Sequence, residues 1–259
     1  MKTLLSFLLF LFVAQNAVSQ ETDSRNVPVT TDSEQALVLF NEGMDALDDV
    51  LLVTASEKFT RAAELDPDFI MPRVMMALGY LYNNDIENFK LHANKAVKSR
   101  AYLTSSEKLL QQAMKALVED PQADVTQYGK KLVEIHPESV LAHQLLANFQ
   151  NLAKDYEGAI KTYQSALEIT REPAPIYNAL GYAYMATNQM DKAKESFEKY
   201  LKAAPNSANA HDSMGDYYAK TQAFEQAQQS YLKAYELDST NFMISQEKAM
   251  KMKEQVAEK

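Results

Sequence analysis

The sequence contains no cysteine and few of the residues that interrupt helices. Its 259 residues include 6 glycines and 8 prolines. The lack of cysteine excludes disulfides, thiolate metal sites, cysteine nucleophiles and a lipid-modified N-terminal cysteine. Strand-like runs of valine, isoleucine and threonine are also missing. Because good helix formers such as alanine, leucine, lysine, glutamate and glutamine dominate instead, the composition predicts an all-α protein.

Positive charge is also in short supply. The chain has 26 lysine and arginine residues against 35 aspartate and glutamate residues, which gives a formal net charge of −9 at pH 7. An acidic surface repels phosphate backbones, so we expect no nucleic-acid partner. The excess of acid is also sufficient to explain solubility, without any ligand.

Long apolar runs are absent outside the N-terminus. There, Lys2 precedes an apolar stretch from Leu4 to Ala14, and the small residues Ala17 and Ser19 follow. A positive charge, a short apolar core and a small-x-small pair are typical of a secretory signal peptide. A helix made by this stretch is about 16 Å long, about half of the hydrocarbon core of a bilayer. The pattern therefore predicts a cleaved signal and not a membrane anchor.

The expected cleavage defines the start of the mature protein. We expect residues 1–19 to be removed near Ser19/Gln20, which gives an exported, soluble protein that is periplasmic or secreted. No cysteine accepts a lipid and no other segment is apolar enough to span a bilayer, so no direct membrane insertion is expected after cleavage. Residues 20–35 are polar, contain Pro28 and lack helical periodicity, which predicts a flexible leader.

Three stretches in the second half of the chain repeat one pattern. They begin at Val140, Ala174 and Ala208, each 34 residues after the one before. Early in each stretch a large apolar residue precedes a small one, as in Leu146-Ala147, Leu180-Gly181 and Met214-Gly215. Later in each stretch three residues follow at i, i+4 and i+7, namely Ala159/Tyr163/Ala166, Ala193/Phe197/Tyr200 and Ala227/Tyr231/Ala234. These spacings place the residues on one face of a helix, where the small residue lets two helices approach and the aromatic residue fills the space opposite.

The period and the pattern resemble the tetratricopeptide repeat. The resemblance implies an all-α fold in which antiparallel helix pairs stack into a right-handed superhelical solenoid. The family pattern has an aromatic residue three places after the small one, which Tyr184 and Tyr218 match, whereas the first stretch has Gln150 there. Tyr200 is larger than the residue that the family pattern has at its place.

The resemblance covers residues 36–241, in about six units. The strongest units are 140–173, 174–207 and 208–241. The first unit begins near Ala36 and matches well, with Gly43 in the small place. Residues 242–259 are rich in lysine, glutamate and methionine, and we expect them to form a C-terminal capping helix.

Two units between residues 70 and 139 depart from the pattern. In the first of them Leu78-Gly79-Tyr80 stands two residues late, which predicts an altered helix or turn. The second opens with a capping box from Thr104 to Glu107. It has Gly129 in the aromatic place, so a plain helical hairpin is an alternative to a true repeat.

Residues that could perform catalysis or bind a metal do not fall into a known motif. The four histidines, His92, His136, His143 and His211, include no pair at i, i+4, so no zinc helix is expected. His211, Asp212 and Ser213 are consecutive, and successive helical residues point about 100° apart, so they cannot form a hydrolase triad. No phosphate-binding glycine loop is present. We therefore expect no enzyme activity, no metal site and no cofactor.

The resemblance places the candidate binding site on the concave face of the solenoid. In this family the first helix of each unit lines the inside of the groove. The corresponding residues of the last three units are Gln144, Asn148, Asn151, Asn178, Tyr182, Met185, Asn209, Asp212 and Asp216. Asparagine suits an extended peptide backbone, tyrosine offers a flat apolar anchor, and the two aspartates favour a basic ligand. A solvated inner face without any ligand is the alternative.

The sequence thus predicts an exported scaffold that binds a protein or an extended peptide through its groove. The alternative is an accessory subunit of a cell-envelope assembly or of a separate enzyme, which binds folded partners by its outer or end faces. The identity of the partner and the oligomeric state do not follow from these residues.

Overall fold

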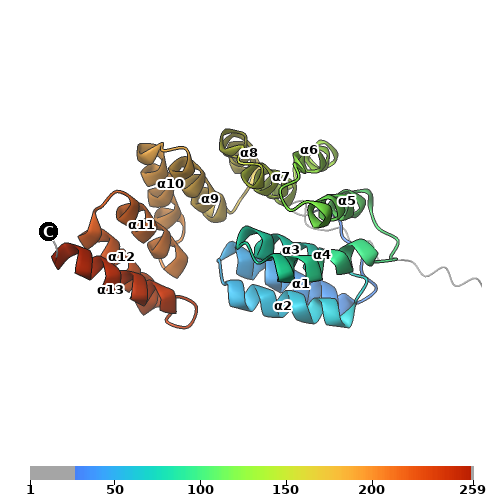
Figure 1. Cartoon of the computed structure of the whole chain (residues 1–259), viewed down its shortest axis with the longest axis horizontal. Helices are drawn as coiled ribbons and strands as arrows, with labels where there is room; N and C mark the ends of the chain where they lie inside the picture. Colours follow the sequence, from blue (N-terminus) through green and yellow to red (C-terminus); the bar gives the residue numbers. More distant parts are fainter. Residues whose placement is uncertain (1–26, 258–259) are drawn as a thin grey trace, which may run out of the picture.

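The computed structural model describes residues 27–257, which form thirteen α-helices and no strand. The first twelve helices make six antiparallel pairs, and a single helix follows them (Figure 1). The helices are α1 (Glu34–Asp48), α2 (Leu52–Leu65), α3 (Ile70–Tyr82), α4 (Ile86–Lys98), α5 (Ser105–Glu119), α6 (Thr126–Ile135), α7 (Val140–Leu152), α8 (Tyr156–Ile169), α9 (Ala174–Ala186), α10 (Met190–Ala203), α11 (Ala208–Lys220), α12 (Phe224–Leu237) and α13 (Met243–Ala257). The all-α prediction is confirmed. The predicted signal peptide lies outside the described residues.

In the first, fifth and sixth pairs, the small and aromatic residues pack as the sequence pattern predicts. A Cβ built at Gly181 would lie 2.3 Å from Cε1 of Phe197, and one at Gly215 would lie 2.5 Å from Cδ1 of Tyr231. Gly43 stands in the same relation to Phe59, at 2.6 Å. Since real Cβ contacts this short do not occur, a side chain at any of these three glycines would have to displace the ring that faces it.

The second pair follows the repeat more closely than the sequence analysis predicted. Helix α3 has 13 residues, as do α7, α9 and α11. Ala77 of α3 stands where Gly181 stands in α9 and is fully buried. Tyr80 stands at the aromatic place of Tyr184. The prediction of an altered helix was wrong, because Ala77 and not Gly79 is the small packing residue.

The third pair differs from the others, as predicted. Helix α6 has only 10 residues and follows a longer connection, residues 120–125. The capping box is present, since Thr104 accepts from the N–H of Glu107 and the Glu107 side chain accepts from that of Thr104. A Cβ at Gly129 would lie 2.8 Å from Cα of Leu146, so this glycine lets α6 approach the backbone of α7.

In every pair except the third, the turn between the two helices contains a residue with a left-handed backbone. This residue is never glycine; the five such residues, with φ between 57° and 60°, are Val50, Asn84, Lys154, Asn188 and Gln222. In the second pair the N–H of Asp85 donates to the carbonyl of Tyr80 at 2.9 Å across this residue. That bond is typical of the Schellman motif, which satisfies the last carbonyls of a helix and fixes the angle at which the chain leaves it.

Residues 27–33 pack on the solenoid, where the sequence analysis expected a flexible leader. Val27 is fully buried. The N–H and hydroxyl of Thr30 donate to Glu107 at 2.9 and 2.7 Å, and the hydroxyl of Thr31 donates to Asp66 at 2.6 Å. These contacts tie the segment to α5 and to the end of α2, because the carboxylates find donors there.

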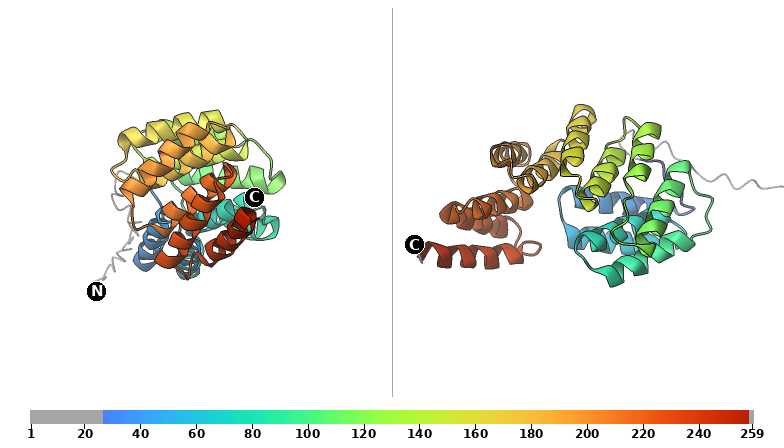
Figure 2. Two further views of the ribbon diagram at one scale, coloured as in Figure 1. Left: turned by 90° about the vertical axis from the view of Figure 1, so that its left-hand side faces the viewer. Right: turned by 45° about the horizontal axis from the view of Figure 1, so that its top comes forward.

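The pairs follow an arch whose two ends approach each other (Figure 1). Leu51, in the turn between α1 and α2, packs against a small cluster made by Ala208, Ala234 and Phe242. Helix α13 packs alongside the last pair at the C-terminal end (Figure 2). None of the described helices has the length and apolar character needed to cross a bilayer. The arch therefore places α1 across the concave side from α7 and α9.

Candidate functional site on the concave face

Three of the groove residues predicted on α9 and α11 belong to a network of hydrogen bonds between these helices. The hydroxyl of Tyr182 donates to Asp216 at 2.8 Å and to Ser213 at 3.3 Å. Ser213 in turn donates to Oδ1 of Asn178 at 2.9 Å. The ring of Tyr182 stands edge-on to Phe197, with centroids 5.3 Å apart. The structure thus brings Asn178, Tyr182 and Asp216 together, but their polar atoms already bond to one another.

Helix α13 supplies a positive charge to the two aspartates of α11. Lys248 lies 2.9 Å from both Asp212 and Asp216. Ser245 donates to Asp212 at 2.6 Å, and Tyr231 donates to Asp216 at 2.8 Å. From the sequence, these acids were expected to attract a basic ligand. In the structure, Lys248 of the same chain supplies the positive charge.

The pKa values in this cluster follow from burial and from the two carboxylates. Burial alone would lower the pKa of Lys248, but Asp212 and Asp216 raise it above its usual value. Burial and then the charge of Asp216 raise the pKa values of Tyr182 and Tyr231. All three groups therefore stay protonated and keep donating at neutral pH.

The other predicted groove residues lie in different surroundings. Asn151 donates to the hydroxyl of Tyr163 at 3.2 Å, and that hydroxyl donates to Asn148 at 3.5 Å. Asn209 is buried and donates to Tyr200 at 3.0 Å, so it does not face the groove. Met185 is half-buried in the apolar core of the repeats. Of the nine predicted residues, Asn148 and Tyr182 are the two that the structure leaves exposed.

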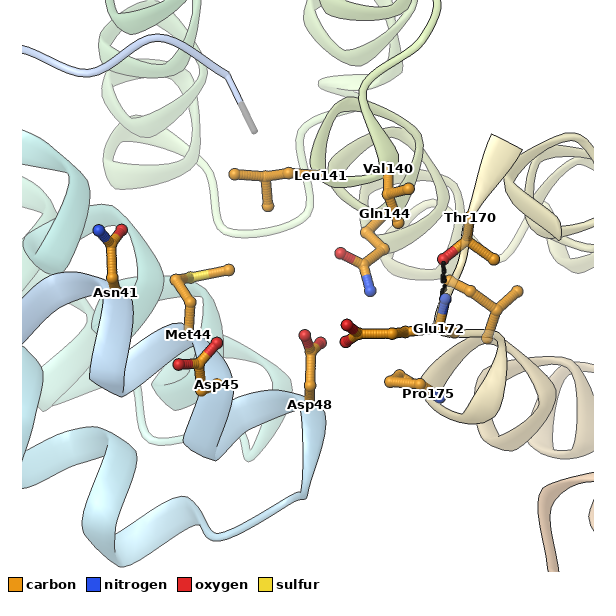
Figure 3. Close-up of a pocket in the computed structure, with 11 residues that line it drawn as sticks. Asn41, Met44, Asp45, Asp48, Val140, Leu141, Gln144, Thr170, Glu172 and Pro175 are labelled. Carbon is orange, nitrogen blue, oxygen red and sulfur yellow. Dashed lines mark hydrogen bonds between the residues drawn. The ribbon is translucent and has the colours of Figure 1, made fainter. Parts of the chain in front are cut away.

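Gln144 lines a cavity of about 280 Å³ between α1, α7 and the start of α9 (Figure 3). The carboxylates of Asp48 and Glu172 point toward each other there, and Asp45 lies on the same side of α1 (Figure 3). The side chain of Gln144 lies near Asp48 and lowers the pKa of that carboxyl, against the effects of burial and of Glu172. Asp45 and Asp48 were not among the predicted site residues, because the repeat pattern gives no signal that units far apart in the sequence meet.

The burial of Asp48 and its closeness to Glu172 change the pKa of Asp48. Burial and then the charge of Glu172 raise the pKa of Asp48 from 3.8 to about 6. The folded state therefore holds a proton that the unfolded chain has lost, over the window between these two values. Since stability falls with pH wherever the folded state binds more protons, this group stabilises the fold at low pH and the contribution is lost as pH rises toward 6.

The residue types of a hydrolase triad do not pair in the structure. Ser213 donates to Asn178, Asp212 accepts from Ser245 and Lys248, and Nε2 of His211 lies 3.3 Å from the carbonyl of Pro205. No His, Asp and Glu cluster that could hold a metal occurs among residues 27–257. The three residue types of a triad are thus each hydrogen-bonded to other partners on this face.

Helix pairs that stack in a row and repeat the same packing positions define a class of protein, the helical repeat solenoids. Residues 150–217 and 208–241 match two family models, both described as tetratricopeptide repeat. Residues 150–241, from the end of α7 to just past α12, are therefore similar to the tetratricopeptide repeat.

Three comparisons agree with this assignment. The chain is 33% identical over 88 residues to protein O-mannosyl-transferase TMTC2 of Homo sapiens, which covers 33% of this chain and 10% of that protein. It is 26% identical over 112 residues to anaphase-promoting complex subunit 3 of Schizosaccharomyces pombe, which covers 43% of this chain and 17% of that protein. The crystal structure of a thermophilic TPR protein of Thermus thermophilus has the same fold, with a TM-score of 0.53 and 16% identity, over 70% of this chain and 98% of that one. The chain thus spans about a tenth to a sixth of the length of these two curated relatives.

Proposed function

We propose that this protein is an exported scaffold that binds a partner protein or an extended peptide along its concave face, and that it catalyses no reaction of its own. The observation that carries the proposal is the regular stacking of α7, α9 and α11. These helices begin 34 residues apart, so that corresponding residues of the three helices line up along one face. Asn148 and the ring of Tyr182 are exposed on this row. An amide and an aromatic ring with a polar tip suit a peptide backbone and its side chains.

The ion pairs of Asp212 and Asp216 with Lys248 make a basic ligand less favourable at this face. A basic side chain would have to compete with Lys248, which lies 2.9 Å from both carboxylates. We therefore expect the ligand to gain most of its affinity from Asn148, Tyr182 and Gln144. Its affinity should also fall less with added salt than the affinity of a basic ligand for unpaired carboxylates would.

The test has two stages. The partner is first captured from a cell-envelope extract with the mature chain and identified by mass spectrometry. Calorimetry then compares the binding of purified partner to variants. Asn148→Ala should weaken binding by about 1–3 kcal/mol, because it leaves a ligand group unpaired. Lys194→Ala, a matched change on the exposed side of α10 where Lys194 lies 3.6 Å from Glu198, should have no effect.

A second candidate function follows from the C-terminal end. Ala249 of α13 stands 34 residues after Gly215, so α13 occupies the place of the first helix of a seventh unit. Its apolar side chains Met243, Ile244 and Met250 are exposed, at 61, 67 and 62%. Such a face suits a folded partner, and one relative is named as a subunit of a complex. If Ile244→Asp abolished binding of the captured partner and Asn148→Ala did not, the end face would be the site.

Export is the other part of the proposal. Its support is the order of Lys2, the apolar stretch and the small residues Ala17 and Ser19. N-terminal sequencing of the protein recovered from an exporting host should give a start near Gln20. A product that stays in the cytosol with Met1 intact would refute export and leave the binding proposal to be judged by the variants.

A further inference from the structure

The joint between the first and second helix pairs contains an apolar cleft that is open to solvent. Its volume is about 160 Å³, and its walls come from α1, α2 and α3. Its apolar lining includes Leu47, Leu52, Phe59, Met75 and Met76. Gly79 also lines it, is exposed, and would carry a Cβ with no atom within 4 Å. None of the predicted groove residues contributes to this cleft.

The cleft lies where two other repeats have an aromatic side chain. Gly79 is the tenth residue of α3, and the tenth residues of α7 and α11 are Phe149 and Tyr217, both buried. The ring of Tyr217 lies 6.4 Å from that of Phe197, on the second helix of the preceding pair. Phe59 holds the place of Phe197 in α2. At the first joint, therefore, the space beside Phe59 that corresponds to the Tyr217 ring is not filled from within the chain.

We propose that this cleft binds one aromatic ring of a partner protein. A cavity of about 150 Å³ lined by leucine, isoleucine and phenylalanine is large enough to hold benzene, and the cleft has this size and a similar lining. The same place in the α10–α11 joint shows that the fold accepts a ring there. Aromatic side chains are also the residues that contribute most affinity when they enter apolar pockets at interfaces. The inference rests on the proposed function only because a partner protein supplies the ring.

The test uses p-cresol, the side-chain analogue of tyrosine, with the mature full chain. Methionine methyl groups labelled with ¹³C report binding by NMR, because Met75 and Met76 line the cleft while Met214 and Met243 lie elsewhere. The Met75 and Met76 signals should shift, because a bound aromatic ring changes the field at nearby methyl groups, and the shifts should saturate with a dissociation constant in the millimolar range. Signals of Met214 and Met243 should stay in place.

Two variants at one position provide the matched control. Gly79→Ala adds one methyl group and should retain binding, whereas Gly79→Phe should place a ring where Tyr217 has one and weaken p-cresol binding about tenfold or more. Leu52→Asn alters an exposed wall of the cleft, at 56% exposure, and should weaken binding even if Gly79→Phe does not fold.

The proposal is overturned if no methyl signal responds up to the solubility of p-cresol, if all methionines respond alike, or if a folded Gly79→Phe binds as well as the parent. These results would leave the concave-face proposal intact, because its test relies on Asn148 and the captured partner. Conversely, p-cresol binding at Met75 and Met76 would stand even if Asn148→Ala had no effect on that partner.

Discussion

Gly181 faces a buried ring and Gly79 faces open space, and a pair of alanine substitutions separates the effects of adding a methyl group at each. Gly181 and Gly79 both lie in 13-residue helices, so each change to alanine gains about 1 kcal/mol from helix propensity. At Gly181 the new Cβ would lie 2.3 to 2.6 Å from three atoms of Phe197, which is fully buried. Overpacking of this kind costs about 1–3 kcal/mol.

The two variants should therefore differ although their chemistry is identical. Gly79→Ala should stabilise the protein by about 0.5–1 kcal/mol, since its Cβ meets no neighbour within 4 Å. Gly181→Ala should be less stable than Gly79→Ala by about 1–3 kcal/mol, because the propensity gain cancels between them. Repeat proteins unfold in parts, so hydrogen exchange of α3 and α9 should accompany urea denaturation. Equal shifts for both variants would refute the packing register.

Three further predictions follow from the described contacts. Val50 is a β-branched residue at φ 57°, so Val50→Asn should stabilise the protein by about 1 kcal/mol in urea denaturation, while Asn188→Val should destabilise it by a similar amount. Asp48→Asn should raise the free energy of unfolding by about 1–3 kcal/mol above pH 7 and have little effect near pH 4. The reason is that burial and Glu172, which raise the pKa of Asp48, disfavour only its charged form. An equal effect at both pH values would contradict this. Lys248→Met should speed hydrogen exchange of α13 by an amount equivalent to about 1–3 kcal/mol, since two half-buried carboxylates lose their counter-charge, and the exposed control Lys251→Met should not.

The sequence predicted the features that depend on contacts within a unit or between neighbouring units. The 34-residue period located the pairs α7 to α12, and the contact of Gly181 with Phe197 follows from residues that repeat with that period. The capping box at Thr104 was also predicted, because its two partners are three residues apart. Such contacts have a fixed spacing and therefore leave a pattern in the chain.

The features that sequence reasoning missed depend on contacts without a fixed spacing. The meeting of Asp48 with Glu172 and Gln144 results from the curvature of the whole arch, and no repeat pattern encodes it. Lys248 lies 32 and 36 residues from the aspartates that it contacts, beyond the last complete unit. The turn residue Val50 was missed for another reason, because left-handed residues are recognised from glycine or asparagine, and neither stands there.

The central claim is that the inner face of the stacked helices holds the partner. Site-specific photo-crosslinking in the producing cell tests it most directly, with a photoreactive amino acid placed at Asn148 on α7 in one variant and at Lys194 on α10 in the other. Both positions are exposed, so neither replacement should disturb the fold. The account predicts a covalent adduct with a partner protein from position 148 and none from position 194. An adduct from position 194 alone, or from neither position, would contradict it.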